Sequence, residues 1–140
     1  MIQNFIAKGK ERLRSMIETR PDWCVSRQRV WGVPLPIFIS KSDGKVLVDE
    51  DVFENIASIY EKEGSDCWFS DDPQKFLGDK YKAKDYVKLK DIVEVWFDSG
   101  STHSFVLEKR GDLKWPASMY LEGSDQHRGW FHSSLLESCG

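Results

Sequence analysis

The feature that most constrains the fold is the passage from an apolar segment into a polar helix start within residues 118–131. Residues 118–121 form a short, mostly apolar segment, and Glu122 and Gly123 follow it directly. The polar residues that come next can cap a helix, which we expect over residues 125–138. A strand that runs straight into a helix is typical of α/β proteins, which bind nucleotides and small polar substrates at such corners.

A similar passage comes earlier in the chain. Residues 92–97 are mostly apolar and suit a buried strand of a parallel sheet. Ser99 or Ser101 can cap a helix that runs through Leu107. The order strand, helix, strand, helix is that of a repeated βα unit. We therefore predict an α/β fold class with a partial doubly wound, Rossmann-like nucleotide-binding core.

This predicted core is incomplete. Two parallel strands are too few to form a sheet with both faces covered. The last expected helix also reaches Cys139 and Gly140 without a polar turn after it. These observations indicate a fragment of a longer protein.

The first part of the chain is predicted to be helical over residues 3–17. Pro21 ends this helix, and residues 22–31 show neither a helical nor a strand period. The expected apolar face of the helix consists of Ile2, Phe5, Ile6, Leu13, Met16 and Ile17.

The middle of the chain reads as a small α+β region. A β-hairpin is expected over residues 37–48, with Gly44 in its turn. A helix should follow Asp49 or Asp51 and end at Gly64. One or two further helical turns are predicted over residues 71–77, closed by Gly78, with a short strand near residues 86–87.

Composition narrows the class of protein. The chain has 140 residues, of which 40% are hydrophobic and 31% charged, as in soluble globular domains. Its net charge of −3 gives no general attraction for nucleic acid, so an RNA partner would need a local basic patch. Cys24, Cys67 and Cys139 lie far apart without metal-ligand spacing, which predicts reduced thiols in the cytoplasm and no zinc site. No apolar run approaches the length of a membrane span.

The corner after residue 121 carries the chemistry of small-molecule binding. Glu122 can accept both hydroxyls of a ribose, and Gly123 lets a ligand approach the backbone. Asp125 stands at a helix start, where free N–H groups can bind an anion. The alternative is that Glu122 is merely solvated and Asp125 merely a cap, and the spacing alone does not separate the two.

Two tryptophans stand beside these predicted strands. If the strands are parallel neighbours, Trp96 and Trp130 can face one cleft and form a slot for an aliphatic side chain. Ordinary core packing is the alternative interpretation.

Arg27 and Arg29 flank an aromatic stretch that ends at Trp31. Arginine pairs bind phosphates and tryptophan stacks on bases, although a solvated loop with ion pairs explains the pattern equally well. The three histidines have no metal-ligand spacing and are interpreted as structural or surface residues. They are His103, His127 and His132.

Three stretches, in this order, resemble signature segments of the isoleucyl-tRNA synthetases, most closely the bacterial form. Residues 20–34 read RPDWCVSRQRVWGVP, residues 95–103 read VWFDSGSTH, and residues 120–131 read YLEGSDQHRGWF. The third stretch is specific to this family within the class I aminoacyl-tRNA synthetases.

The resemblance implies a class I synthetase with a doubly wound core that is interrupted by insertions. Residues 1–34 would return from the editing insertion, residues 35–90 would be a small connecting insertion, and residues 91–140 would begin the second half of the core. The family's His-Ile-Gly-His and Lys-Met-Ser-Lys-Ser motifs, which handle the ATP phosphates, are not in this chain.

The resemblance also implies residue roles. Trp96 and Trp130 would flank the isoleucine side chain, and Gln126 would help to bind its amino group. Glu122 would hold the ribose of the adenylate, with Gly123 and Asp125 alongside. Arg27 and Arg29 would lie toward the acceptor end of the tRNA. No catalytic residue and no metal ligand is expected among them.

For the whole enzyme, the resemblance implies isoleucine, isoleucine tRNA and ATP with Mg²⁺ as substrates, a cytoplasmic monomer, and no membrane or obligate protein partner. The chain alone is expected to be inactive. Two alternatives without catalysis remain: a free-standing nucleotide-binding protein that uses Glu122, and a module whose residues 35–90 bind RNA or another domain.

Overall fold

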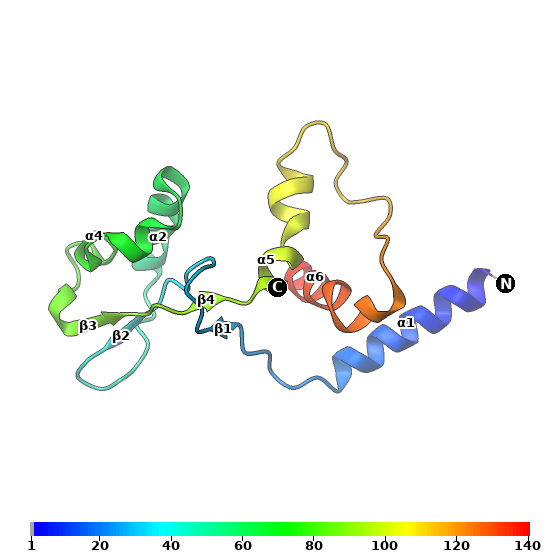
Figure 1. Cartoon of the computed structure of the whole chain (residues 1–140), viewed down its shortest axis with the longest axis horizontal. Helices are drawn as coiled ribbons and strands as arrows, with labels where there is room; N and C mark the ends of the chain where they lie inside the picture. The colour runs from blue at the N-terminus through cyan, green and yellow to red at the C-terminus, as the bar shows by residue number, and fades with distance from the viewer. Residues whose placement is uncertain (1) are drawn as a thin grey trace. The chain divides into compact units, whose positions relative to one another are not determined.

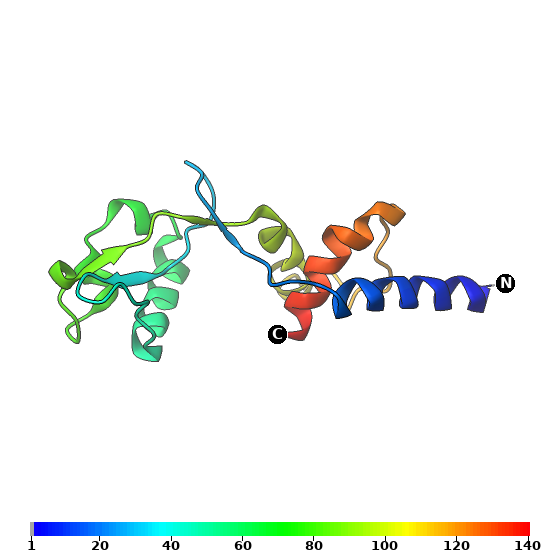
Figure 2. The same ribbon diagram turned by 90° about the horizontal axis from the view of Figure 1, so that it is seen from below.

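The computed structural model describes the backbone of residues 2–140 and the side chains of residues 9–140. The chain forms two compact units. Unit 1 consists of Met1–Val25 and Glu94–Gly140, and unit 2 consists of Ser26–Val93. Figures 1 and 2 show the elements of both units.

Unit 2 is built on two short antiparallel strand pairs. Strand β1 (Ser26–Arg27) pairs with β4 (Ile92–Val93), so the two ends of the unit are hydrogen-bonded to each other. Strand β2 (Phe38–Ser40) pairs with β3 (Tyr86–Lys88), which confirms the strand predicted near residues 86–87.

The predicted hairpin is present in a short form. Ile39 and Val46 form a single antiparallel bridge. The Leu47 N–H donates to the Phe38 carbonyl at 2.9 Å. Gly44 has a φ of +70°, a conformation that glycine adopts without steric cost, and this explains its place in the turn.

The helices of unit 2 begin and end where the sequence predicts. Helix α2 (Glu50–Glu63) starts at Asp49, whose carboxylate accepts the N–H of Asp51 at 3.0 Å, and it stops at Gly64. Helix α4 (Pro73–Leu77) ends at Gly78. Two shorter elements are α3 (Cys67–Ser70) and the 3₁₀ turn η1 (Ala83–Asp85).

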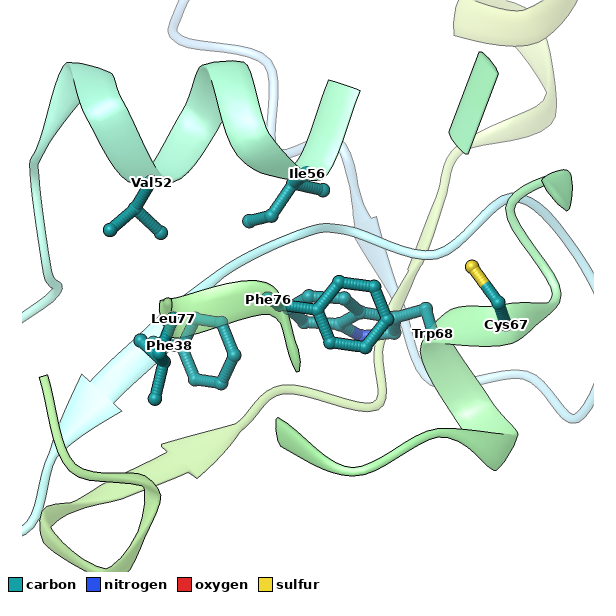
Figure 3. Close-up of a cluster of buried hydrophobic side chains, with 7 residues drawn as sticks. All are labelled: Phe38, Val52, Ile56, Cys67, Trp68, Phe76 and Leu77. Atoms are coloured by element: carbon teal, nitrogen blue, oxygen red, sulfur yellow. The ribbon is translucent and has the colours of Figure 1, made fainter. Parts of the chain in front are cut away.

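The core of unit 2 gathers around Trp68, which is fully buried. Its indole N–H donates to the Leu89 carbonyl at 2.8 Å, so the polar atom of this large side chain is satisfied. Val52 and Ile56 point from α2 toward the aromatic rings beneath it (Figure 3). The cluster consists of Phe38, Val52, Ile56, Cys67, Trp68, Phe76 and Leu77.

Unit 1 is helical. Helix α1 (Ile2–Glu18) confirms the predicted helix before Pro21. On its expected apolar face, Leu13, Met16 and Ile17 are half-buried. The side chains of Ile2, Phe5 and Ile6 lie outside the described residues. After Val93 come α5 (Val95–Gly100), the π-helix η2 (His103–Glu108), the 3₁₀ helix η3 (Ser124–Arg128) and α6 (Trp130–Cys139).

The two strands predicted for the core differ from the structure. Of residues 92–97, only Ile92–Val93 is a strand, and it pairs in the antiparallel sense. Glu94 explains the change, because its carboxylate accepts the N–H of Trp96 at 3.0 Å and caps a helix at that point. A short apolar run does not by itself separate strand from helix.

Residues 118–121 contain no strand. Among the described residues no neighbouring strand lies beside this segment, and a lone strand cannot satisfy its backbone groups. The predicted parallel pairing is therefore not seen. The helix expected over residues 125–138 is present as η3 followed by α6. The described chain is a mixed α/β structure with short sheets.

Candidate functional site

Gln126 organises the segment that the sequence marks as most polar. Its side-chain oxygen accepts the backbone N–H of Trp130 at 3.1 Å, and its amide nitrogen donates to Asp125 at 3.0 Å. A Cβ on Gly129 would lie 2.6 Å from the Gln126 oxygen, so only glycine fits there. The amide is thus held in one orientation between η3 and α6.

Glu122, Gly123 and Asp125 are exposed. A side chain on Gly123 would collide with the Asp125 carboxylate, so this glycine permits the close approach of Asp125 to the backbone. These residues lie where an external ligand can reach them, and the exposed carboxylates are free to accept hydroxyl groups.

The two predicted tryptophans lie close to this segment in different settings. Trp130 stacks on Tyr120 with ring centroids 4.8 Å apart, and its indole N–H donates to the Ser99 carbonyl at 2.9 Å. Trp96 is 41% exposed and lies beside Gly129.

Trp96, but not Trp130, lines a cavity of about 330 Å³. The single cleft that we predicted from parallel strands is therefore not formed by these two indoles. Their roles in substrate binding remain predictions.

Arg27 and Arg29 belong to unit 2. Arg27 donates to the Ser26 carbonyl at 2.8 Å beside strand β1. Arg29 and Trp31 are exposed and line an open hollow together with Lys90. The two side chains give this loop a basic and aromatic surface, as the sequence predicts.

Sequence reasoning missed a contact between Arg20 and His132. The Arg20 guanidinium donates to His132 Nε2 at 3.1 Å and lies over the ring of Trp23, 5.0 Å from its centroid. Burial, together with the positive charge of Arg20, lowers the pKa of His132. The only local signal was the closeness of Arg20 and Trp23 in the sequence.

A second missed feature is the buried carboxyl group of Glu137. Neither of its oxygens has a hydrogen-bond partner, and the carboxyl group fills the space where Gly100 lacks a side chain. Burial raises the pKa of Glu137 to about 7, with Asp98 adding to the rise and His103 opposing it. Glu137 can therefore change charge near neutral pH.

No group of three or more His, Cys, Asp or Glu side chains among the described residues is arranged to hold a metal ion. Within the same part of the chain, every helix is too short or too polar to cross a bilayer.

Comparison with known proteins defines the class. Residues 2–139 match the family described as tRNA synthetases class I (I, L, M and V). The chain belongs to this family.

Its relatives identify the branch. The isoleucine–tRNA ligase of Pelagibacter ubique (strain HTCC1062) is 82% identical over 133 residues, which cover 95% of this chain and 15% of the relative. The isoleucine–tRNA ligase of Brucella abortus (strain 2308) is 59% identical over 135 residues, covering 96% of this chain and 14% of the relative. That of Zymomonas mobilis is 56% identical over 136 residues, with 97% and 14% covered. The predicted resemblance to isoleucyl-tRNA synthetases is confirmed, and the chain spans about 15% of the length of these relatives.

Proposed function

We propose that this chain is part of an isoleucine–tRNA ligase and that unit 1 contributes to its isoleucine and adenylate site. The observation that carries the proposal is the 82% identity to an isoleucine–tRNA ligase over 95% of the chain. A whole enzyme of this kind activates isoleucine with ATP and transfers it to isoleucine tRNA.

The first step joins the isoleucine carboxylate to the α-phosphate of ATP and expels pyrophosphate. In the second step a ribose hydroxyl of the tRNA attacks the isoleucyl carbonyl, and AMP leaves. Both steps depend mainly on the positioning of reactants and the stabilisation of charge. The residues of this chain act in that way, by positioning, and none is assigned a proton transfer.

Gln126 and Glu122 supply the polar contacts of the proposal. The Gln126 oxygen is fixed by the Trp130 N–H at 3.1 Å, and its remaining lone pair can accept from the isoleucine ammonium. The exposed Glu122 carboxylate would accept the ribose hydroxyls, with Gly123 and Asp125 alongside.

Trp96 and Trp130 supply the apolar contacts to the isoleucine side chain. The exposed face of Trp96 and the fixed ring of Trp130 on Tyr120 offer rigid surfaces that lose little entropy on binding. Both indoles lie beside residues of the Gln126 segment. This neighbourhood supports a joint role for them.

The architecture of the whole enzyme is also part of the proposal. Residues 1–34 would return from the editing insertion, residues 35–90 would form a small insertion, and residues 91–140 would open the second half of a doubly wound, Rossmann-like core. The pairing of β1 with β4 supports the insertion, because it joins the two ends of unit 2 as an inserted domain requires.

Arg27 and Arg29 are proposed to contact the acceptor end of the tRNA. ATP would arrive with Mg²⁺, and we assign the ion no ligand here because the described residues offer no suitable group. The whole enzyme is proposed to be a cytoplasmic monomer.

A chimera tests the proposed function. The chain replaces the matching segment of the Pelagibacter ubique ligase, and isoleucine-dependent exchange of pyrophosphate into ATP is measured. We expect activity close to that of the unmodified ligase and none from the chain alone. An inactive but folded chimera, or an active isolated chain, would contradict the proposal.

Trp130→Ala in this chimera tests the amino-acid site. The loss of the indole should raise the isoleucine KM by about tenfold or more, with a smaller effect on the ATP KM. Phe105→Ala, which removes an exposed aromatic ring of η2, serves as the control. An unchanged isoleucine KM would remove Trp130 from the site.

A further inference from the structure

Unit 1 contains a polar cavity that none of the roles above uses in full. Its volume is about 330 Å³, which is enough for a small ligand. Two arginines line it, and we name it the two-arginine cavity. Its principal walls are Arg20, Trp23, Trp96, Arg128 and His132.

The cavity presents positive charge. Among the described residues, neither Arg20 nor Arg128 forms an ion pair with a carboxylate. Asp22 is the one acidic residue of the lining. Two guanidiniums without acidic partners beside a hollow are suited to bind an anion with several oxygens.

Arg20 is held in place before any ligand arrives. An arginine only donates hydrogen bonds, so His132 Nε2 must be the acceptor of their 3.1 Å contact. The lowered pKa of His132 keeps its ring neutral and able to accept. Trp23 supports the guanidinium from another side, with its ring centroid 5.0 Å away. His132 is therefore a positioning residue for Arg20.

Trp96 adds a flat apolar wall. It is 41% exposed, and none of the ring pairs among the described residues includes it. An indole with an open face stacks on nucleic-acid bases of any type. The cavity thus combines anion-binding groups with a stacking surface.

We propose that the two-arginine cavity binds one nucleotide of the single-stranded end of a tRNA, with its phosphate on Arg20 and Arg128 and its base toward Trp96. The inference rests on the proposed function, and it adds a binding site for the nucleic-acid substrate. A lone carboxylate would need one guanidinium and no stacking wall, so an amino acid explains the cavity less completely.

The test measures two steps in the chimera. Transfer of isoleucine from the preformed adenylate to tRNA is followed in a single turnover, and pyrophosphate exchange is followed without tRNA. Arg20→Ala and Arg128→Ala should each slow transfer about tenfold or more beyond any effect on exchange. Arg110→Ala, which removes an exposed arginine paired with Asp112, should leave both rates unchanged.

His132 provides a second, independent variant. His132→Leu removes the acceptor and should slow transfer as Arg20→Ala does, whereas His132→Gln restores an acceptor oxygen and should recover most of the rate. Rescue by glutamine separates positioning of Arg20 from a packing role.

Equal losses in transfer and exchange would overturn the inference, since they would place the cavity at the ATP or amino-acid site or give it a structural role only. Unchanged transfer would also overturn it. An unsubstituted chimera that lacks exchange would instead count against the proposed function, so the two failures are distinguishable.

Discussion

Units 1 and 2 solve different problems with the same chain. Unit 2 buries Phe38, Trp68 and Phe76 almost completely and pairs the indole N–H of Trp68. Unit 1 instead buries polar groups, among them His132 and the carboxyl of Glu137, and the latter has no hydrogen-bond partner.

Exposed surfaces show the same contrast. Unit 1 leaves Trp96, Trp115 and Leu121 largely exposed and contains the two-arginine cavity. Large apolar side chains in the open and buried polar groups both cost stability, and they are retained where they bind something. The difference teaches that unit 2 is organised for stability and unit 1 for binding.

The largest effect is expected in the core of unit 2. Trp68→Ala should lower the free energy of unfolding by about 3–5 kcal/mol, because it removes a fully buried ring and its hydrogen bond to Leu89. Chemical denaturation followed by circular dichroism measures the change. Phe69→Ala is the matched control, since that neighbouring ring is 46% exposed and its loss should cost less than about 1 kcal/mol. Equal losses would break the contrast between the units.

Glu137→Gln should show the opposite sign in unit 1. The folded state holds the proton of Glu137 more tightly than the unfolded state, so its contribution is fully present below pH 4.5 and is lost as the pH rises to about 7. At pH 8 we expect the variant to be more stable by about 1 kcal/mol, with no difference at pH 4.

Unfolding curves across this pH range measure the effect of Glu137→Gln. Glu108→Gln, at an exposed position, should change stability at neither pH. A stability gain from Glu137→Gln that is the same at both pH values would rule out the titration of Glu137 as its cause.

A smaller effect is expected from Asp49→Ala in unit 2. Hydrogen bonds from Lys80 and Tyr81 lower the pKa of Asp49 to about 2. The contribution of this carboxylate is therefore present above pH 3.8 and is lost as the pH falls toward 2. The variant should have a lower unfolding midpoint at pH 7, and the gap should narrow in acid.

The neighbouring Asp51→Ala is the control for this variant, because the Asp51 side chain is 82% exposed and pairs with Lys80 alone. A gap between Asp49→Ala and the unsubstituted chain that stays constant down to pH 2 would show that the carboxylate acts only as a helix cap.

Much of unit 2 was predictable because its signals are local. The cap at Asp49 and the helix ends at Gly64 and Gly78 each depend on residues within one turn of the chain. The hairpin around Gly44 follows from a positive φ that glycine tolerates. Such features need no knowledge of distant contacts.

Unit 1 resisted prediction because its contacts are distant. Arg20 and His132 lie 112 residues apart in the sequence, and no periodicity relates them. The apolar run at residues 92–97 suited a strand, and the Glu94 cap turned its second half into a helix. The candidate site residues were chosen through the family resemblance, while the cavity beside Trp96 was visible only in the structure.

The most direct test compares one exposed indole from each unit in the chimera. Trp96 is 41% exposed in unit 1 and Trp31 is 88% exposed in unit 2, so neither substitution removes a core residue. If unit 1 carries the amino-acid site, Trp96→Ala should raise the isoleucine KM of pyrophosphate exchange by about tenfold or more, and Trp31→Ala should leave it unchanged. An unchanged isoleucine KM in Trp96→Ala, or an equal rise in both variants, would contradict the assignment of binding to unit 1.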